Sequence, residues 1–192
     1  MNALILVIIL AIVEGITEFL PVSSTGHMIL VNKLIGGEYL SPTFTNSFLI
    51  IIQLGAILSV VVYFWKDLTP FVGTKEKFVL RFRLWVKILV GVIPAMVIGL
   101  FLDDIIDKYF MDNVTTIAIT LIVYGIIFIV IEVIYKIKNV KARVRNFSEL
   151  KYGTAFLIGF FQCLAMIPGT SRSGATIIGA LLLGLSRPLA AE

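Results

Sequence analysis

Two polar segments of this sequence carry side chains that could do chemistry, and both interrupt apolar stretches. The first, residues 14–27, reads EGITEFLPVSSTGH, and the second, residues 168–176, reads PGTSRSGAT. Together they supply two carboxylates, one imidazole, one guanidinium and several hydroxyls. Ionisable side chains at bilayer depth are costly and by default mark a site that faces protein or water. This set of groups is suited to phosphate chemistry at a membrane.

The rest of the chain has the composition of an integral membrane protein. Of its 192 residues 59% are hydrophobic and only 15% are charged, and the mean hydropathy is +1.03. Soluble domains carry ~25% charged residues. Three apolar runs, residues 48–65, 88–102 and 114–131, come close to the ~17–25 residues that a spanning helix needs. We therefore predict a polytopic all-α membrane protein with three conventional spans.

Charge is distributed very unevenly between the predicted loops. Lysine and arginine gather in residues 66–87 and 136–151, whereas aspartate dominates residues 103–112. Loops rich in lysine and arginine stay on the cytoplasmic side of a membrane. The two basic segments are therefore expected inside the cell and the acidic segment outside.

Each polar segment predicts a re-entrant hairpin. Pro21 and Gly26 interrupt the first one, between apolar arms at residues 4–13 and 28–35. A ten-residue arm extends about 15 Å as a helix, which is roughly half of the hydrocarbon core. Such a turn is allowed at membrane depth only where protein or water satisfies its backbone.

The second polar segment repeats this arrangement, between arms at residues 152–167 and 175–185. From the charge pattern the first hairpin enters from outside and the second from inside. Two hairpins that enter the membrane from opposite sides are typical of an inverted repeat whose binding site lies near the midplane of the bilayer. We expect one transmembrane domain, residues 1–192. Residues 1–135 complete one repeat of a hairpin and three spans, and residues 152–192 supply only the hairpin of a second, so the chain is expected to be C-terminally truncated.

The hydroxyls and backbone amides at the two loop-to-helix junctions predict a phosphate site. Unsatisfied N–H groups and the positive end of a helix attract phosphate oxygens. Arg172 adds a planar donor fork that can hold phosphate bidentately. The structural alternative is that Arg172 pairs with a carboxylate or with carbonyl groups. The predicted substrate-binding residues are Ser23, Thr25, Gly26, Gly169, Thr170, Ser171, Ser173 and Gly174.

Glu14 and Glu18 lie one helical turn apart in an apolar segment, where two carboxylates repel each other unless a proton or a cation intervenes. They could bind a divalent cation, Mg²⁺ or Ca²⁺, or one of them could accept a proton. The alternative is a polar stripe satisfied by neighbouring hydroxyls.

His27, the sole histidine, can share a helical face with Ser24 and act as its base. The nucleophile stays open between Ser24, His27 and a metal-bound water. Gln53 is polar within a predicted span; it either supports the site or is satisfied between helices.

Taken together, the two motifs resemble the paired signatures of the bacterial undecaprenyl-diphosphatase family, the bacitracin-resistance membrane phosphatases. The resemblance extends to residues 53–58 (QLGAIL), 93–95 (IPA) and 161–165 (FQCLA), and so covers nearly the whole chain. Family members usually continue for several more transmembrane helices. The catalytic set that the resemblance implies falls on Glu14, Glu18, Ser24, His27 and Arg172.

The resemblance implies hydrolysis of undecaprenyl diphosphate to undecaprenyl phosphate and inorganic phosphate. This reaction returns the lipid carrier to cell-wall synthesis and gives resistance to bacitracin. It further implies a multi-pass protein of the bacterial cytoplasmic (inner) membrane whose site opens outward, with a polyprenyl diphosphate lipid as its partner and no nucleic acid. The alternatives are a lipid flippase or transporter, an inactive fragment of the phosphatase and, for the assembly, a homodimer.

Overall fold

The computed structural model describes residues 3–35, 42–71, 73–110 and 114–191, and the regular structure of these residues is helical. An isolated bridge between Val144 and Leu185 is the exception. In chain order the elements are α1 (Ala3–Thr17), α2 (Ser24–Leu34), α3 (Pro42–Tyr63), α4 (Trp65–Leu68), α5 (Lys75–Phe110), α6 (Val114–Ile137), α7 (Tyr152–Cys163), the 3₁₀ turn η2 (Leu164–Met166), α8 (Arg172–Leu182) and α9 (Arg187–Ala191).

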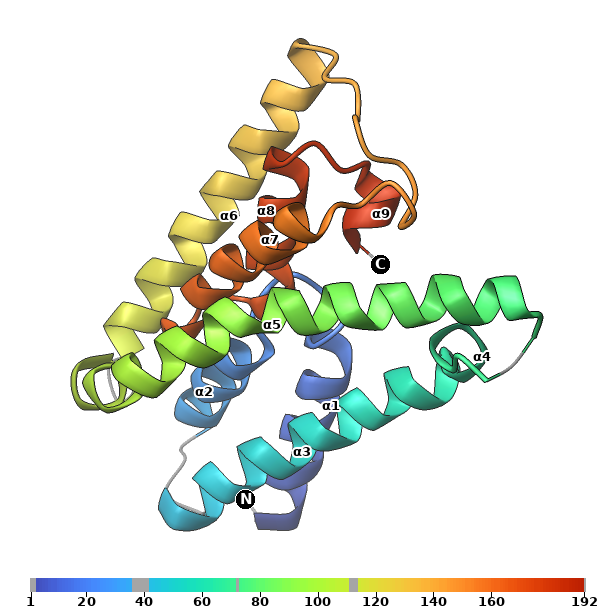
Figure 1. The fold of residues 1–192 in the computed structure, drawn as a ribbon. Coiled ribbons are helices and arrows are strands. Elements are labelled where there is room, and N and C mark those ends of the chain that lie inside the picture. The colour runs from blue at the N-terminus through green and yellow to red at the C-terminus, as the bar shows by residue number, and fades with distance from the viewer. Residues whose placement is uncertain (1–2, 36–41, 72, 111–113, 192) are drawn as a thin grey trace.

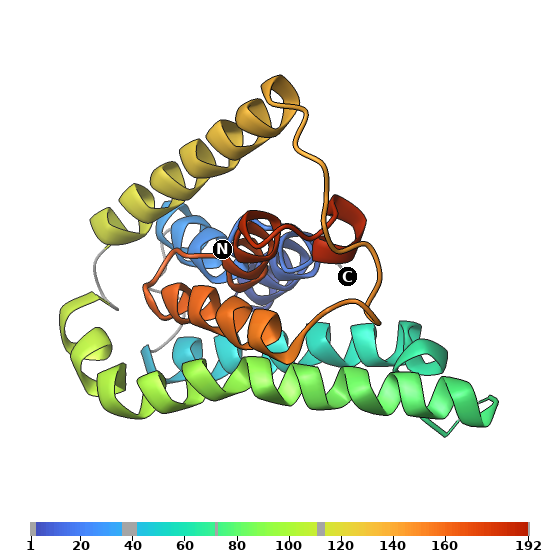
Figure 2. The ribbon, with the colours of Figure 1, turned by 45° about the horizontal axis from the view of Figure 1, so that its top comes forward.

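Two helical hairpins lie inside a frame of long helices. Figure 1 shows α3, α5 and α6 as the long members, and Figure 2 shows the short helices α1, α2, α7 and α8 in the angle between α5 and α6. The α1–α2 hairpin contacts α3 and α6, and the α7–α8 hairpin contacts α5 and α6. α6 therefore touches both hairpins.

The frame helices expose apolar side chains that a soluble protein would bury. The most apolar 18-residue windows within residues 75–102 of α5 and 114–137 of α6 have mean hydropathies of 2.3 and 2.8, and only 11% of each window is buried. Leu100 and Ile129 are 80% and 65% exposed. Because such contiguous apolar surface is unfavourable in water, lipid is the medium that suits these helices. The structure thus supports the membrane character expected from composition.

Small residues let α7 lie directly against α5. A Cβ atom added to Gly159 would come within 2.0 Å of the Gly91 carbonyl oxygen and 3.0 Å of Pro94 Cδ. Pro94 stands inside α5 without ending it. The buried Lys87 then ties α5 to the segment before α7, because its Nζ donates to the Phe147 carbonyl oxygen at 2.6 Å. This contact fixes the second hairpin on its frame helix.

Several helices extend beyond the boundaries that hydropathy predicts. The basic segment 66–87 was expected to be a loop, yet α5 begins at Lys75 and α4 occupies part of the remainder. That expectation was wrong because lysine, glutamate and arginine are good helix formers. The second arms of the two hairpins also begin earlier than predicted, at Ser24 instead of residue 28 and at Arg172 instead of residue 175, since the serine before each one caps the helix.

Candidate active site

The second helices of the two hairpins begin in the same way. Ser23 Oγ accepts a hydrogen bond from the Gly26 amide at 3.3 Å, and Ser171 Oγ accepts one from the Gly174 amide at 3.1 Å. A serine in this position satisfies one of the N–H groups that a helix start leaves unpaired. The preceding N–H groups have no partner within the helix, and the helix dipole makes this end positive. Both starts are therefore suited to an anion.

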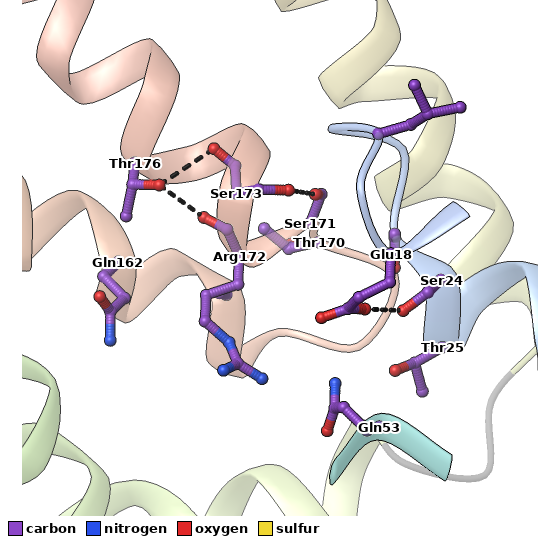
Figure 3. A pocket seen from close by; sticks show the side chains of 13 residues that line it. Glu18, Ser24, Thr25, Gln53, Gln162, Thr170, Ser171, Arg172, Ser173 and Thr176 are labelled. Carbon is purple, nitrogen blue, oxygen red and sulfur yellow. Dashed lines mark hydrogen bonds between the residues drawn. The ribbon is translucent and has the colours of Figure 1, made fainter. Parts of the chain in front are cut away.

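Both helix starts open on one cavity of about 280 Å³. Figure 3 shows side chains of the two hairpins and of α3 arranged around it. The cavity is large enough for a phosphate-bearing headgroup and too small for a long lipid chain. Its lining residues are Glu18, Leu20, Ser23, Ser24, Thr25, Gln53, Gln162, Ala165, Thr170, Ser171, Arg172, Ser173 and Thr176.

Ser24 is paired with Glu18 at the side of the cavity formed by the first hairpin. Ser24 Oγ donates to Glu18 Oε2 at a distance of 2.5 Å (Figure 3). Ser24 is only 5% exposed, and Glu18 follows the last residue of α1. A short hydrogen bond to a carboxylate prepares a hydroxyl to lose its proton. This pair has the geometry of a nucleophile and its base.

Glu14 lies deeper, in the last turn of α1. It is 1% exposed, and neither carboxylate oxygen has a hydrogen-bond partner in the part of the chain that the structure describes. A buried carboxylate without a hydrogen-bond partner is so costly that it calls for a proton or a cation. Glu14 is therefore the described residue whose surroundings fit a missing positive charge best.

His27 stands on α2 one turn after Ser23. Its Nδ1 donates to the Ser23 carbonyl oxygen at 2.9 Å. We assign the proton to Nδ1 because a carbonyl can only accept. Nε2 is then free to accept a proton, but His27 does not line the cavity. In this geometry Glu18, and not His27, accepts the hydrogen bond of Ser24.

Arg172 reaches into the cavity from the first residue of α8 (Figure 3). Within the part of the chain that the structure describes, its guanidinium makes no ion pair with a carboxylate. The structural alternative of an internal salt bridge thus finds no support there. Beside it, the hydroxyls of Ser171 and Ser173 are hydrogen-bonded to each other at 3.0 Å. The cavity therefore holds a positive charge and hydroxyl groups at this helix start.

One short segment of α6 supports both hairpins. A Cβ atom added to Gly26 would lie 3.4 Å from Ile117 Cγ2 and 3.5 Å from Leu121 Cδ1. Gly169, at φ +88°, lies so close that an added Cβ would be 2.1 Å from Thr120 Oγ1. Thr120 Oγ1 also donates to the Pro168 carbonyl oxygen at 2.8 Å. We call residues 117–121 the α6 platform.

The cavity unites most of the residues that the sequence points to. Glu18, Ser23, Ser24, Thr25, Thr170, Ser171, Arg172 and Ser173 line it, whereas Glu14, Gly26, His27, Gly169 and Gly174 do not. Sequence reasoning did not single out Leu20, Ala165, Gln162 and Thr176 as site residues, and it left Gln53 open. Thr176 could have been found from its place one turn after Arg172, and Gln162 as a polar residue in an apolar segment.

A divalent cation fits this carboxylate pair only in part. The described residues contain no cluster of three or more histidine, cysteine, aspartate or glutamate side chains that could hold a metal. Mg²⁺, however, is commonly bound by one or two carboxylates together with substrate phosphates and water. The unpaired oxygens of Glu14 are consistent with that mode.

The sequence matches a known family along nearly all of its length. A model of the family described as "Bacitracin resistance protein BacA" matches residues 7–192. The chain belongs to this family. Proteins that are similar to it in sequence carry the name undecaprenyl-diphosphatase.

Three of these relatives show how close the similarity is. The undecaprenyl-diphosphatase of Fusobacterium nucleatum is 83% identical over 187 residues, which cover 97% of this chain and 70% of that protein. Undecaprenyl-diphosphatase 1 of Clostridioides difficile is 52% identical, over 96% of this chain and 66% of that protein. The undecaprenyl-diphosphatase of Acetivibrio thermocellus is 51% identical, over 100% of this chain and 70% of that protein. The chain thus spans about two thirds of the length of these relatives.

Proposed function

We propose that this chain hydrolyses undecaprenyl diphosphate to undecaprenyl phosphate and inorganic phosphate, the activity that the names of its relatives state. One observation carries the proposal: the starts of α2 and α8 share one cavity, into which one brings Ser24 bonded to Glu18 and the other brings Arg172. The reaction would recycle the lipid carrier for cell-wall synthesis, and bacitracin resistance agrees with the family description.

The diphosphate headgroup binds to the two helix starts. Free N–H groups there, the hydroxyls of Thr25 and Ser173, and the guanidinium of Arg172 supply donors to its oxygens. Phosphoryl transfer depends mostly on positioning and on stabilising charge that develops on the equatorial oxygens. Arg172 performs this second task because its charge is not used by a carboxylate of the described residues.

Ser24 attacks the terminal phosphorus in this mechanism. The proton of Ser24 Oγ passes to Glu18 Oε2 as the new P–O bond forms. The bond from the terminal phosphorus to the bridging oxygen breaks, and undecaprenyl phosphate leaves with that oxygen. Water then cleaves the phosphoserine, which releases phosphate and restores the serine hydroxyl. In the rival pathway a water attacks directly and Ser24 only binds phosphate.

A divalent cation, Mg²⁺ or Ca²⁺, is part of the proposal, and Glu14 and Glu18 would hold it. Such a cation neutralises phosphate charge and lets two carboxylates approach each other. The orphaned oxygens of Glu14 support this assignment.

The proposed setting is the bacterial cytoplasmic membrane, which the chain crosses several times. The apolar surfaces of α5 and α6 support spanning helices, and the polar tips of both hairpins, covered by α6, support re-entrant hairpins. Placing the basic segments 66–87 and 136–151 inside the cell makes the site open outward.

Phosphate release from undecaprenyl diphosphate by the purified 192-residue chain tests the function. Release should need divalent cation and fall about 100-fold or more in Arg172→Ala. The matched control is Arg187→Ala, because Arg187 forms an exposed ion pair with Glu132 away from the cavity. Retained release in Arg172→Ala would contradict the proposed site. Binding of the lipid without release of phosphate would instead favour a flippase or transporter. Transport needs two compartments and is not detected with solubilised protein, whereas hydrolysis is.

A further inference from the structure

The chain contains two glutamines, Gln53 and Gln162, and both line the cavity. They come from α3 and α7, so neither belongs to the polar segments that supply the hydroxyls, the carboxylates and Arg172. Both side chains are half-buried. Two amides have therefore been brought to one place from helices that are otherwise largely apolar.

Neither amide group has a hydrogen-bond partner among the described residues. A polar side chain that lines a cavity and has no protein partner there is available to hydrogen-bond a ligand. Ordinary structural glutamines between helices bond to a neighbouring backbone or side chain. Gln53 and Gln162 point instead into the space that the proposed substrate headgroup would fill.

Arg172 lies beside these two amides. In Figure 3 its guanidinium group lies between the amide ends of Gln53 and Gln162, and all three line the same cavity. Arg172 likewise has no carboxylate partner in the described ranges. Three side chains with unused N–H donors therefore border one space, and only one of them is charged.

The two hairpins place opposite hydrogen-bonding groups at matched positions. Glu18 follows Gly15 by three residues at the end of α1, and Gln162 follows Gly159 by three residues near the end of α7. The carboxylate of Glu18 accepts from Ser24, whereas an amide Nε2 can donate to an anion. A second carboxylate at position 162 would repel phosphate, but glutamine adds donors without adding negative charge.

We infer that Gln53 and Gln162 are substrate-binding residues that donate from Nε2 to the phosphate oxygens of a diphosphate headgroup, beside Arg172. This inference rests on the proposed function and names further residues of the same site. The amides recognise the headgroup and not the lipid chain, so their removal weakens binding of any diphosphate, with or without a lipid.

The test uses variants that keep side-chain length and remove the donors, Gln53→Met and Gln162→Met, together with the charge-adding Gln162→Glu. The probe is methylene diphosphonate, which has no lipid and resists hydrolysis. Its Kd is measured by equilibrium titration of the solubilised 192-residue chain, and KM and kcat are measured with undecaprenyl diphosphate. Each methionine variant should raise Kd and KM about 10-fold, the effect of losing a hydrogen bond to a charged group. Gln162→Glu should raise both further, while kcat of the methionine variants changes less than about 3-fold.

Ser59→Ala is the matched control on α3, because Ser59 is exposed, does not line the cavity and bonds only to the Ala56 carbonyl. It should leave both constants unchanged. An unchanged Kd for methylene diphosphonate in both methionine variants would overturn the inference, even if KM for the lipid rose. If the wild type binds the diphosphonate but releases no phosphate from undecaprenyl diphosphate, the proposed hydrolysis is refuted. The ratios of the variant Kd values to the wild-type Kd would still decide the role of the glutamines. Absence of diphosphonate binding by the wild type would also overturn the inference.

Discussion

Ser24 and Arg172 occupy the same structural position in two hairpins that are far apart in the sequence. Each is the first residue of a helix and directly follows the serine that caps it. Both side chains line one cavity. The same capping hydrogen bond thus occurs twice, although Ser23 (φ 63°) and Ser171 (φ −74°) differ in backbone conformation. The first helix presents a hydroxyl bonded to a carboxylate, and the second presents a guanidinium that can receive an anion.

Replacing Glu18 by glutamine should impair the reaction about as much as replacing Ser24 by alanine. The Oε2 atom of Glu18 is the acceptor of the Ser24 hydroxyl, and an amide is a far weaker base. Both single variants should lose about 100-fold or more in kcat, and the double variant should lose little more, because residues that act as a unit are not additive. Single-turnover kinetics on the three variants checks this.

A Ser24→Ala variant that keeps more than a few per cent of the activity would instead favour direct attack by water. Thr17→Val is a suitable control, because Thr17 bonds only to the Val13 carbonyl within α1 and does not line the cavity.

Ser23→Gly should make the protein more stable, and Ser23→Ala should make it less stable. It adopts φ 63° and ψ 90°, a left-handed conformation that costs a non-glycine residue about 1–2 kcal/mol. Glycine relieves this cost and loses only a few tenths of a kcal/mol as a helix cap, whereas alanine keeps the strain and loses about 1 kcal/mol of capping. In thermal unfolding in detergent, the midpoint temperature should be highest for Ser23→Gly, intermediate for the wild type and lowest for Ser23→Ala. A glycine variant that melts below the alanine variant would show that this strain is absent.

Thr120 should matter to substrate binding although it lies outside the cavity lining. Its hydroxyl lies 2.8 Å from the Pro168 carbonyl oxygen at the tip of the second hairpin, the nearest of three carbonyl oxygens to which it can donate. Thr120→Val keeps the shape, leaves that carbonyl unpaired and should cost about 1 kcal/mol of stability. It should also raise KM more than it lowers kcat, while Thr120→Ser should restore both. Equal changes in kcat and KM, not rescued by serine, would indicate general unfolding.

Glu149, in the segment before α7, should titrate below the usual range for glutamate. Hydrogen bonds from the Arg145 backbone amide at 2.8 Å and from Asn146 Nδ2 at 3.2 Å lower its pKa. Because the folded pKa lies below the unfolded one, the carboxylate stabilises the fold at neutral pH and this contribution disappears as pH falls through the folded pKa. Nuclear magnetic resonance titration of labelled glutamate would measure the pKa. Glu149→Gln should flatten the acid limb of the stability curve, and an unshifted pKa would contradict the prediction.

Sequence patterns were sufficient for the parts of the fold that depend on local chemistry. Serine and glycine after an apolar run predicted the polar tips around Ser24 and Arg172, because few other roles suit such residues at membrane depth. The apolar runs within α3, α5 and α6 predicted the long helices, although their ends differ because charged helix formers extend them.

The remaining features depend on tertiary contacts that no local pattern encodes. Glu18 approaches Ser24 because the chain between them turns back through a strained Ser23, and spacing alone had suggested His27 as the partner. Gln162 became part of the site because α7 is held against α5 through Gly159. A single glutamine in an apolar helix has no periodicity from which its orientation could be predicted.

The α6 platform has a consequence for how the protein is made. Gly26 of the first hairpin and Gly169 of the second both contact residues 117–121, and this segment follows the first hairpin in the chain and precedes the second. During synthesis, at a pace of about 5–20 residues per second, the first hairpin is therefore complete before the α6 segment that its tip contacts has been made. The tip of the first hairpin can therefore reach its final contacts only after α6 has been synthesised.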